Sequence, residues 1–305
     1  MRRYRVVTAA VVAFGTLGLS HPLSAQNMDA VQISAQSLGG GIYMLTGQGG
    51  NIGLSVGDDG VFIIDDQFAP LTEKILASIA DITSESVRFV FNTHWHGDHT
   101  GGNENLGGTG ALIVAHENVR ERLSTDQVLE RIGRPAAESP AVPEGAWPVV
   151  TFSEDVTFHL NDDELHAFHV ENAHTDGDAI VHFKRANIVH MGDTFFRDRF
   201  PFIDTATGGS IDGVIAAAGA ALALMDADTQ VIPGHGALSN REDLREYRDA
   251  LKTMRDAVAD LMERGRSLQQ IINARPIRAQ GEAWGQSEAA EASFVETIHH
   301  GIGGQ

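Results

Sequence analysis

From about residue 26 onward, short apolar runs alternate with glycine-rich turns, a pattern that predicts β-strands. The first three predicted strands cover residues 41–46, 52–56 and 61–65. Residues 70–80 instead place apolar side chains at helical spacing, and the proline that begins this segment is suited to the first turn of a helix. Residues 87–91 form a largely apolar run, as expected of a buried strand.

The remainder of the chain repeats this order of strands and helices. A predicted strand at 112–114 and helix at 116–123 lead into residues 124–147, whose low periodicity predicts an excursion over the surface. The later predicted strands cover residues 156–160, 164–170, 179–183, 188–191 and 230–232. The later predicted helices cover residues 211–225 and 241–264, and the tail is predicted to be helical as well.

Two similar halves, each with strands before helices, predict two sheets packed face to face with helices outside them. The expected fold is therefore a four-layer αββα sandwich of the α/β class. No repeat of fixed period and no linker divides residues 26–305. We expect these residues to form a single domain with a helical C-terminal segment.

The first 25 residues have the pattern of a signal peptide. Arg2, Arg3 and Arg5 precede an apolar stretch over residues 6–19, and Leu23-Ser24-Ala25 is an acceptable cleavage sequence. The apolar stretch is too short for an ordinary transmembrane helix. We therefore expect an exported protein, located in the periplasm, with no membrane span after cleavage.

Composition narrows the kinds of partner and of metal site. The formal net charge is −19, which disfavours binding to phosphate backbones, so we expect a small-molecule substrate rather than a nucleic acid. The chain has no cysteine, which excludes disulfides and thiolate ligands. Histidine, present 14 times, is therefore the residue type through which transition-metal chemistry is expected.

The densest group of possible ligands is HWHGDH, which begins at His94 and directly follows the predicted strand 87–91. His94 and His96 are two residues apart, so on extended backbone they project to the same side. Asp98 and His99 are adjacent and can converge with them only if the chain turns. Four ligand-type side chains within six residues predict a metal site at the end of this strand.

Three later segments contain further candidate ligands in glycine-containing turns at strand ends. His174 lies between two predicted strands, Asp193 follows the strand 188–191, and His235 follows the strand 230–232. Enzymatic zinc sites commonly draw their ligands from several chain segments. We therefore expect these three side chains to join the group around His94.

With these residues, the chain resembles the metallo-β-lactamase superfamily from about residue 42 to 236. The resemblance implies an αββα sandwich with a metal site at one edge of the sheets. It implies a first ion held by His94, His96 and His174, and a second held by Asp98, His99 and His235. Asp193 matches the bridging carboxylate, and either Asp65 or Asp66 matches a residue that supports a ligand from behind.

The absence of cysteine and the presence of Asp193 make the chain more similar to glyoxalase II and lactonases than to true lactamases. The resemblance implies two zinc ions per chain, with iron or manganese possible at one position. A hydroxide bridging them is expected to attack an ester, thioester, lactone or amide carbonyl, with Asp98 orienting the hydroxide.

Three alternatives remain open at this point. The first is β-lactamase activity within the same fold. The second is an iron-dependent sulfur dioxygenase, which the presence of both His99 and His235 disfavours. The third is a periplasmic metal- or cofactor-binding protein without turnover. The phenylalanines at 195, 196, 200 and 202 are expected either to pack in the core or to line the pocket.

Overall fold

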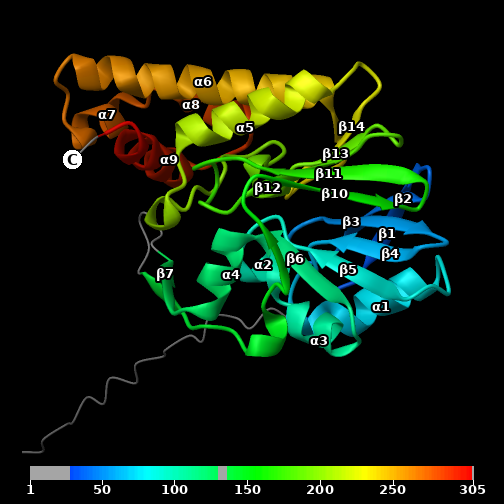
Figure 1. Cartoon of the computed structure of the whole chain (residues 1–305). Helices are drawn as coiled ribbons and strands as arrows, with labels where there is room; N and C mark the ends of the chain where they lie inside the picture. The colour runs from blue at the N-terminus through cyan, green and yellow to red at the C-terminus, as the bar shows by residue number, and fades with distance from the viewer. Residues whose placement is uncertain (1–27, 130–135, 304–305) are drawn as a thin grey trace, which may run out of the picture.

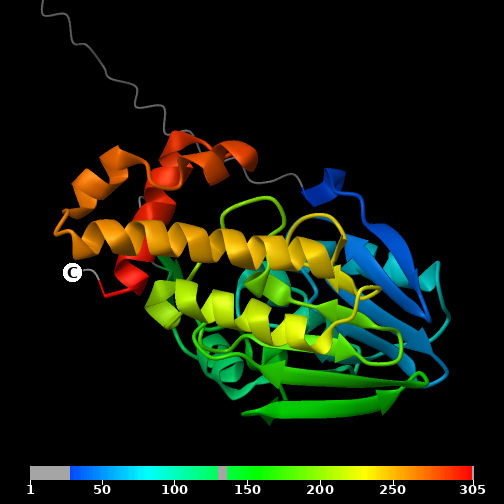
Figure 2. The same cartoon turned by 90° about the horizontal axis from the view of Figure 1, so that it is seen from above.

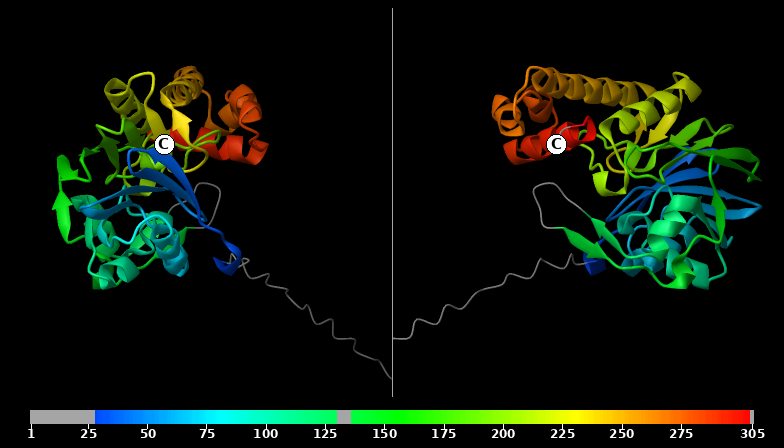
Figure 3. Two further views of the ribbon diagram at one scale, coloured as in Figure 1. Left: turned by 90° about the vertical axis from the view of Figure 1, so that its right-hand side faces the viewer. Right: turned by 60° about the vertical axis from the view of Figure 1, so that its left-hand side comes forward.

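Two β-sheets face each other in the computed structural model, which describes residues 28–129 and 136–303 (Figure 1). Helices cover the outer face of each sheet, as the views in Figures 1 and 3 show. The predicted four-layer αββα sandwich is confirmed. The predicted signal peptide, residues 1–25, lies outside the described residues, as do residues 130–135 of the predicted surface excursion.

The first sheet contains seven strands within the described residues. In spatial order they are β1 (Ser34–Gly39), β2 (Ile42–Thr46), β3 (Ile52–Gly57), β4 (Gly60–Ile64), β5 (Val87–Phe91), β6 (Leu112–His116) and β9 (Val150–Phe152). Strands β1 to β4 pair antiparallel. Strands β4, β5, β6 and β9 run parallel, so their carboxyl ends lie at the same edge of the sheet.

Within the described residues, the second sheet contains six strands. They are β10 (Asp155–Leu160), β11 (Asp163–His169), β12 (Ala179–Phe183), β13 (Ile188–His190), β14 (Gln230–Ile232) and β15 (Ser239–Asn240). Strands β13 and β14 are parallel, and the other neighbours are antiparallel. A separate hairpin joins β7 (Gln127–Leu129) to β8 (Ala137–Ser139).

Helices α5 (Ile211–Leu224) and α6 (Arg241–Glu263) lie side by side over the second sheet (Figure 2). The C-terminal helices are α7 (Leu268–Ala274), α8 (Arg278–Ala283) and α9 (Glu288–Gly301). Side chains of α7 and α9, and Ile277 and Trp284 on either side of α8, pack in one hydrophobic cluster with α5 and α6. The first sheet is covered by α1 (Thr72–Ala80) and α3 (Asn103–Gly108), and α4 (Glu117–Ser124) follows β6. No helix of residues 28–129 and 136–303 is long and apolar enough to cross a membrane.

Strand β4 shows why the chain forms layers. Its side chains alternate between the two faces of the sheet, and both faces are covered. Val61 and Ile63 pack with α1, whereas Phe62 and Ile64 pack between the sheets. All four are at most 1% exposed, so this strand is apolar throughout rather than alternating with polar residues.

Several short elements were not predicted. Strands β1, β9 and β15 have little apolar alternation of their own, and they are held by pairing with longer neighbours. The predicted surface excursion contains the β7–β8 hairpin, and the HWHGDH segment contains a short helix, α2 (Gly97–Thr100). Pairing partners and tertiary contacts set these elements, which local sequence patterns do not reveal.

Candidate metal centre

The candidate ligands gather at one end of the sandwich, where strands from both sheets finish. The loop after β5 carries the HWHGDH residues of the first sheet. From the second sheet, His174 lies between β11 and β12, Asp193 follows β13, and His235 follows β14. The centre therefore lies across the boundary between the sheets, as expected from the sequence.

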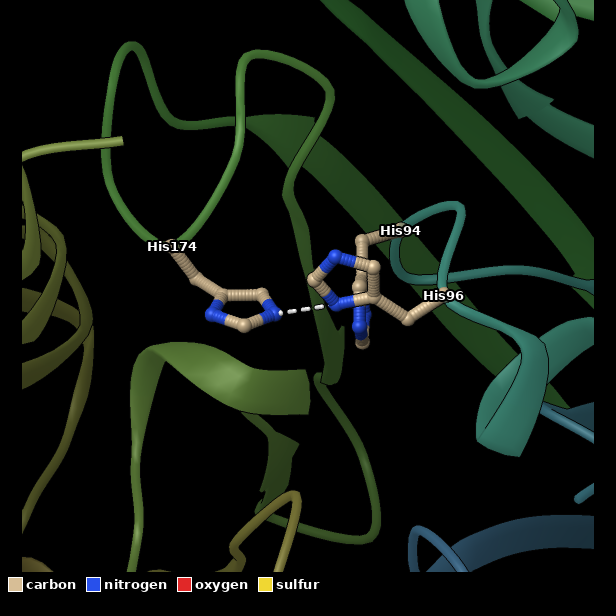
Figure 4. Close-up of side chains that lie close together, drawn as sticks. All are labelled: His94, His96 and His174. Carbon is tan, nitrogen blue, oxygen red and sulfur yellow. Dashed lines mark hydrogen bonds between the residues drawn. The ribbon is translucent and has the colours of Figure 1, made fainter. Parts of the chain in front are cut away.

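The first group consists of His94, His96 and His174, whose ligand atoms lie within 4.8 Å of one another. Figure 4 shows the three imidazoles pointing toward one another from two separate loops. His94 and His174 have no exposed surface, and His96 is 7% exposed. The Nδ1 atom of His96 lies 2.8 Å from the Nε2 atom of His174.

The second group consists of Asp98, His99 and His235, which meet the same distance criterion. The Nε2 atom of His235 lies 3.4 Å from an Asp98 carboxylate oxygen, and 3.4 Å from His99 Nε2. Asp193 lies between the groups, with one carboxylate oxygen 3.1 Å from His99 Nε2 and the other 3.6 Å from His174 Nε2. The structure thus brings together all seven predicted ligands.

Hydrogen bonds on the outer side of the rings fix which nitrogen faces the centre. The hydroxyl of Thr93 donates its hydrogen to Asp65 at 2.8 Å. Its oxygen therefore accepts the Nδ1–H of His94 at 3.0 Å. The same Asp65 oxygen accepts the Nδ1–H of His99 at 2.7 Å. In both histidines the Nε2 lone pair is consequently left to face the centre.

His174 and His96, the other two buried histidines among the candidate ligands, are arranged in the same way. The carbonyl of Phe202 accepts the Nδ1–H of His174 at 2.7 Å. A carboxylate oxygen of Asp204 accepts the Nε2–H of His96 at 3.1 Å, which directs Nδ1 of His96 inward. Asp204 was not predicted from the sequence, because it is 108 residues from His96 and has no motif around it.

These contacts fit a cation better than they fit an empty cluster of side chains. Two inward nitrogens without hydrogens, on His96 and His174, repel each other at 2.8 Å unless a positive ion lies between their lone pairs. Within the described residues, His94 Nε2 is buried and has no hydrogen-bond partner. Buried polar atoms are normally paired, so this nitrogen indicates a ligand that is not part of the chain.

The local charges differ between the two groups. Burial lowers the pKa of His174 to about 4, so its ring is neutral at pH 7. Burial alone would lower the pKa of His235, but the carboxylates of Asp193 and Asp98 outweigh this effect. The pKa of His235 is therefore raised to about 9. Burial alone would raise the pKa of Asp98, but His99 and His235 outweigh this effect. The pKa of Asp98 is therefore lowered to about 2. In the metal-free chain His235 is therefore an imidazolium paired with these carboxylates, and a metal ion that binds there would displace its proton.

The structure distinguishes Asp65 from Asp66. Asp65 contacts His99 and Thr93 directly, and its φ of 61° turns the chain sharply after β4. Asp66 accepts only the backbone N–H of Gly102, at 2.8 Å, and burial raises its pKa. Asp65 is therefore the residue that supports a candidate ligand from behind.

The predicted alternatives for the phenylalanines both apply, to different residues. Phe196 stacks on the His235 ring, and Phe202 lies 5.6 Å from the His96 ring and 5.7 Å from the His174 ring. Phe195 contacts Tyr247 of α6, and Phe200 stacks on Phe294 of α9. Two rings thus border the centre, while the other two attach this loop to the helices.

Two glycines allow the backbone to approach the ligands closely. A Cβ atom at Gly50 would overlap the His99 ring, and one at Gly234 would overlap an Asp193 oxygen. Residues 50 and 234 therefore need to be glycine for steric reasons rather than for an unusual φ. A cavity of about 570 Å³ lies at the opposite strand ends, beside Asp59 and Asn161, and does not adjoin the centre.

Residues 45–262 match the model of the metallo-β-lactamase superfamily, which is more than half of the chain. The chain belongs to the metallo-β-lactamase superfamily. This family agrees with the arrangement of layers and with the histidine and aspartate groups at the sheet edge. The resemblance seen in the HWHGDH segment is confirmed.

One matching protein and two similar solved structures are each less than 30% identical to this chain. A hydroxyacylglutathione hydrolase of Erythrobacter litoralis is 28% identical over 112 residues, which are 36% of this chain and 35% of that protein. A stereoselective inverting sec-alkylsulfatase of a Pseudomonas species has a TM-score of 0.62 at 15% identity, covering 88% of this chain and 50% of the sulfatase. A metallo-β-lactamase from Pontibacter korlensis has a TM-score of 0.57 at 18% identity, covering 72% of this chain and 99% of the lactamase.

The different contacts of the two neighbouring aspartates lead to a first prediction. Asp65→Asn places an amide where one oxygen now accepts hydrogen bonds from both Thr93 and His99, so the His99 ring loses its anionic partner. We expect zinc affinity to fall about 10- to 100-fold. Asp66→Asn is the control, because the amide oxygen can still accept from Gly102 and the Asp66 side chain makes no hydrogen bond to a candidate ligand. Competition with a metal chelator measures both, and equal affinities would contradict the role of Asp65.

A second prediction concerns pH and His190, which lies outside the two groups. Burial lowers the pKa of His190 to about 4, below its ordinary value of 6.5. The unfolded chain therefore binds a proton first as the pH falls, so stability is lost between about pH 6.5 and 4. His190→Gln should flatten this loss in the metal-free protein by up to about 1.4 kcal/mol per pH unit, measured by urea unfolding. A slope equal to that of the parent would show that His190 does not titrate in this range.

Proposed function

We propose that this chain is a dinuclear metal-dependent hydrolase that attacks the carbonyl of a small ester, thioester, lactone or amide. The observation that carries the proposal is the set of four buried imidazoles whose outer N–H groups are all hydrogen-bonded and whose inner nitrogens converge. Such outer partners are typical of metal-binding histidines. The family match supports the same class of enzyme.

His94, His96 and His174 would hold one ion, and Asp98, His99 and His235 the other, with Asp193 between them. Two divalent ions, zinc by preference for imidazole and carboxylate ligands, would lower the pKa of water and polarise a carbonyl. Asp98 stays ionised at neutral pH because its pKa is about 2, and its side chain is 28% exposed. It is therefore placed to accept a hydrogen bond from water and to orient it toward the substrate.

Among possible substrates, we rank acyl esters, thioesters and lactones above β-lactams. Asp193 supplies a carboxylate between the two groups and no cysteine is present, which separates this ligand set from that of cysteine-containing lactamases. The matched region of the hydroxyacylglutathione hydrolase supports the same ranking. The aromatic rings of Phe196 and Phe202 favour substrates with an apolar group beside the scissile bond.

The test combines metal analysis with a hydrolysis panel on the purified chain and on Asp193→Asn. We expect two transition-metal ions per parent chain, and turnover of thioesters, lactones or activated esters that a chelator abolishes and zinc restores. Asparagine at 193 removes a charge that offsets the repulsion between two dications. The variant should therefore bind the pair more weakly, and kcat should fall by about 100-fold or more, with partial recovery in excess zinc.

Three outcomes would overturn parts of this proposal. A single tightly held iron, with no second ion after zinc addition, would favour the dioxygenase. A penicillin or carbapenem as the best substrate would reverse the ranking. Two bound ions without turnover of any compound would favour a metal- or cofactor-binding protein.

We also propose that the protein is exported to the periplasm and that residues 26–305 are the mature chain. The support is the pattern of Arg2, Arg3 and Arg5 followed by an apolar stretch and Leu23-Ser24-Ala25. When the full chain is produced in a Gram-negative host, N-terminal sequencing of the periplasmic fraction should begin at Gln26. An intact N-terminus in the cytoplasmic fraction would refute export.

A further inference from the structure

The ligand set is divided between two sheets, so its geometry depends on how the sheets are offset. The apolar side chains between the sheets, such as Phe62 and Val181, resist separation but have little directional preference. A directional contact near the centre is therefore needed to fix the position of one loop against the other. Asn51, at the end of the β2–β3 loop, makes such a contact.

Asn51 of the first sheet holds the backbone on both sides of His235, which belongs to the second. Its side-chain amide donates to the carbonyls of Pro233 at 2.8 Å and Gly236 at 2.9 Å. Its backbone N–H donates to the carbonyl of Gly234 at 2.7 Å. Three hydrogen bonds thus connect one residue to the four-residue turn that carries His235.

The carbonyl of Asn51 is also engaged, because it accepts the Nε2–H of His190 at 3.2 Å. His190 projects between the sheets from β13 and rests against Gly53, where a Cβ atom would lie 2.8 Å from the ring. Asn51 is only 5% exposed, and its amide hydrogens, N–H and carbonyl all have partners. It therefore connects the loop of one sheet with strand β13 and with the turn after β14 of the other.

We propose that Asn51 is a positioning residue for His235, and that it sets the affinity of the Asp98, His99 and His235 group for its metal ion. This inference rests on the proposed metal function. The residue before Asn51 supports it, because Gly50 packs on the ring of His99 and its N–H donates to the carbonyl of Asp98 at 3.0 Å. The segment 50–51 therefore contacts all three members of the second group or their backbone.

Asn161 provides a matched control at the opposite end of the sandwich. It also links the sheets, because its amide in the β10–β11 turn donates to Ser55 Oγ at 3.1 Å and to the carbonyl of Gly60 at 2.9 Å. It contacts no candidate ligand. Its φ of 52° is left-handed, so Asn161→Gly removes the side-chain bonds without adding backbone strain.

The experiment compares Asn51→Ala with Asn161→Gly and with the parent. Chelator competition measures the affinity for the first and second zinc ion, cobalt substitution reports the ligand geometry by its visible absorption, and urea unfolding reports stability. We expect Asn51→Ala to weaken one of the two zinc affinities about 10- to 100-fold and to change the cobalt spectrum. Both variants should lower the free energy of unfolding by a similar amount. Asn161→Gly, however, should leave both zinc affinities and the cobalt spectrum unchanged.

The milder Asn51→Ser keeps one donor and should give an intermediate loss of affinity, which maintains the test if the alanine variant does not fold. If the parent binds two ions and Asn51→Ala matches it in both affinities and in the cobalt spectrum, Asn51 is only structural and the inference fails. If the parent itself binds fewer than two ions, the proposed function fails first, so the two failures are distinguishable.

Discussion

The centre depends on keeping inward-facing imidazole nitrogens free of protons. A neutral imidazole carries one N–H, and a fixed acceptor on the outer side decides which nitrogen carries it. Such acceptors are provided to His99 by Asp65, to His96 by Asp204 and to His174 by the Phe202 carbonyl. The hydroxyl of Thr93, held by Asp65, is the acceptor for His94. Each acceptor is buried or is held by backbone, so the tautomers are set by the fold before any ion binds.

The fold provides these acceptors because parallel strands end together. Asp65 follows β4 and His94 follows β5, its parallel neighbour, while Asp193 and His235 follow the parallel strands β13 and β14. Each sheet therefore carries a short row of polar loops at one edge, while both faces of the sheet are packed with apolar side chains. The two rows meet because the sheets pack face to face, and the turn around His235 is tied back to the first sheet.

Local patterns in the sequence predicted the layers and the seven candidate ligands, because strand alternation and the HWHGDH spacing are properties of short segments. The supporting residues were harder to foresee. Asn51 contacts a turn 182 to 185 residues away, and Asp204 contacts a ring 108 residues away, so neither lies in a motif with its partner. The choice between Asp65 and Asp66 required knowing which carboxylate the turn after β4 directs toward His99.

The two groups differ in what covers them. His94 and His174 have no exposed surface, whereas the side chains of Asp98 and His235 are 28% and 18% exposed. His96 is 7% exposed and His99 is fully buried, so an ion in the first group would be the more enclosed of the two, while one in the second would face solvent beside Asp98 and His235. If the proposed centre holds two ions, the one beside Asp98 and His235 would exchange with solvent more readily, and the proposed hydrolysis would then depend on the metal supply around the protein.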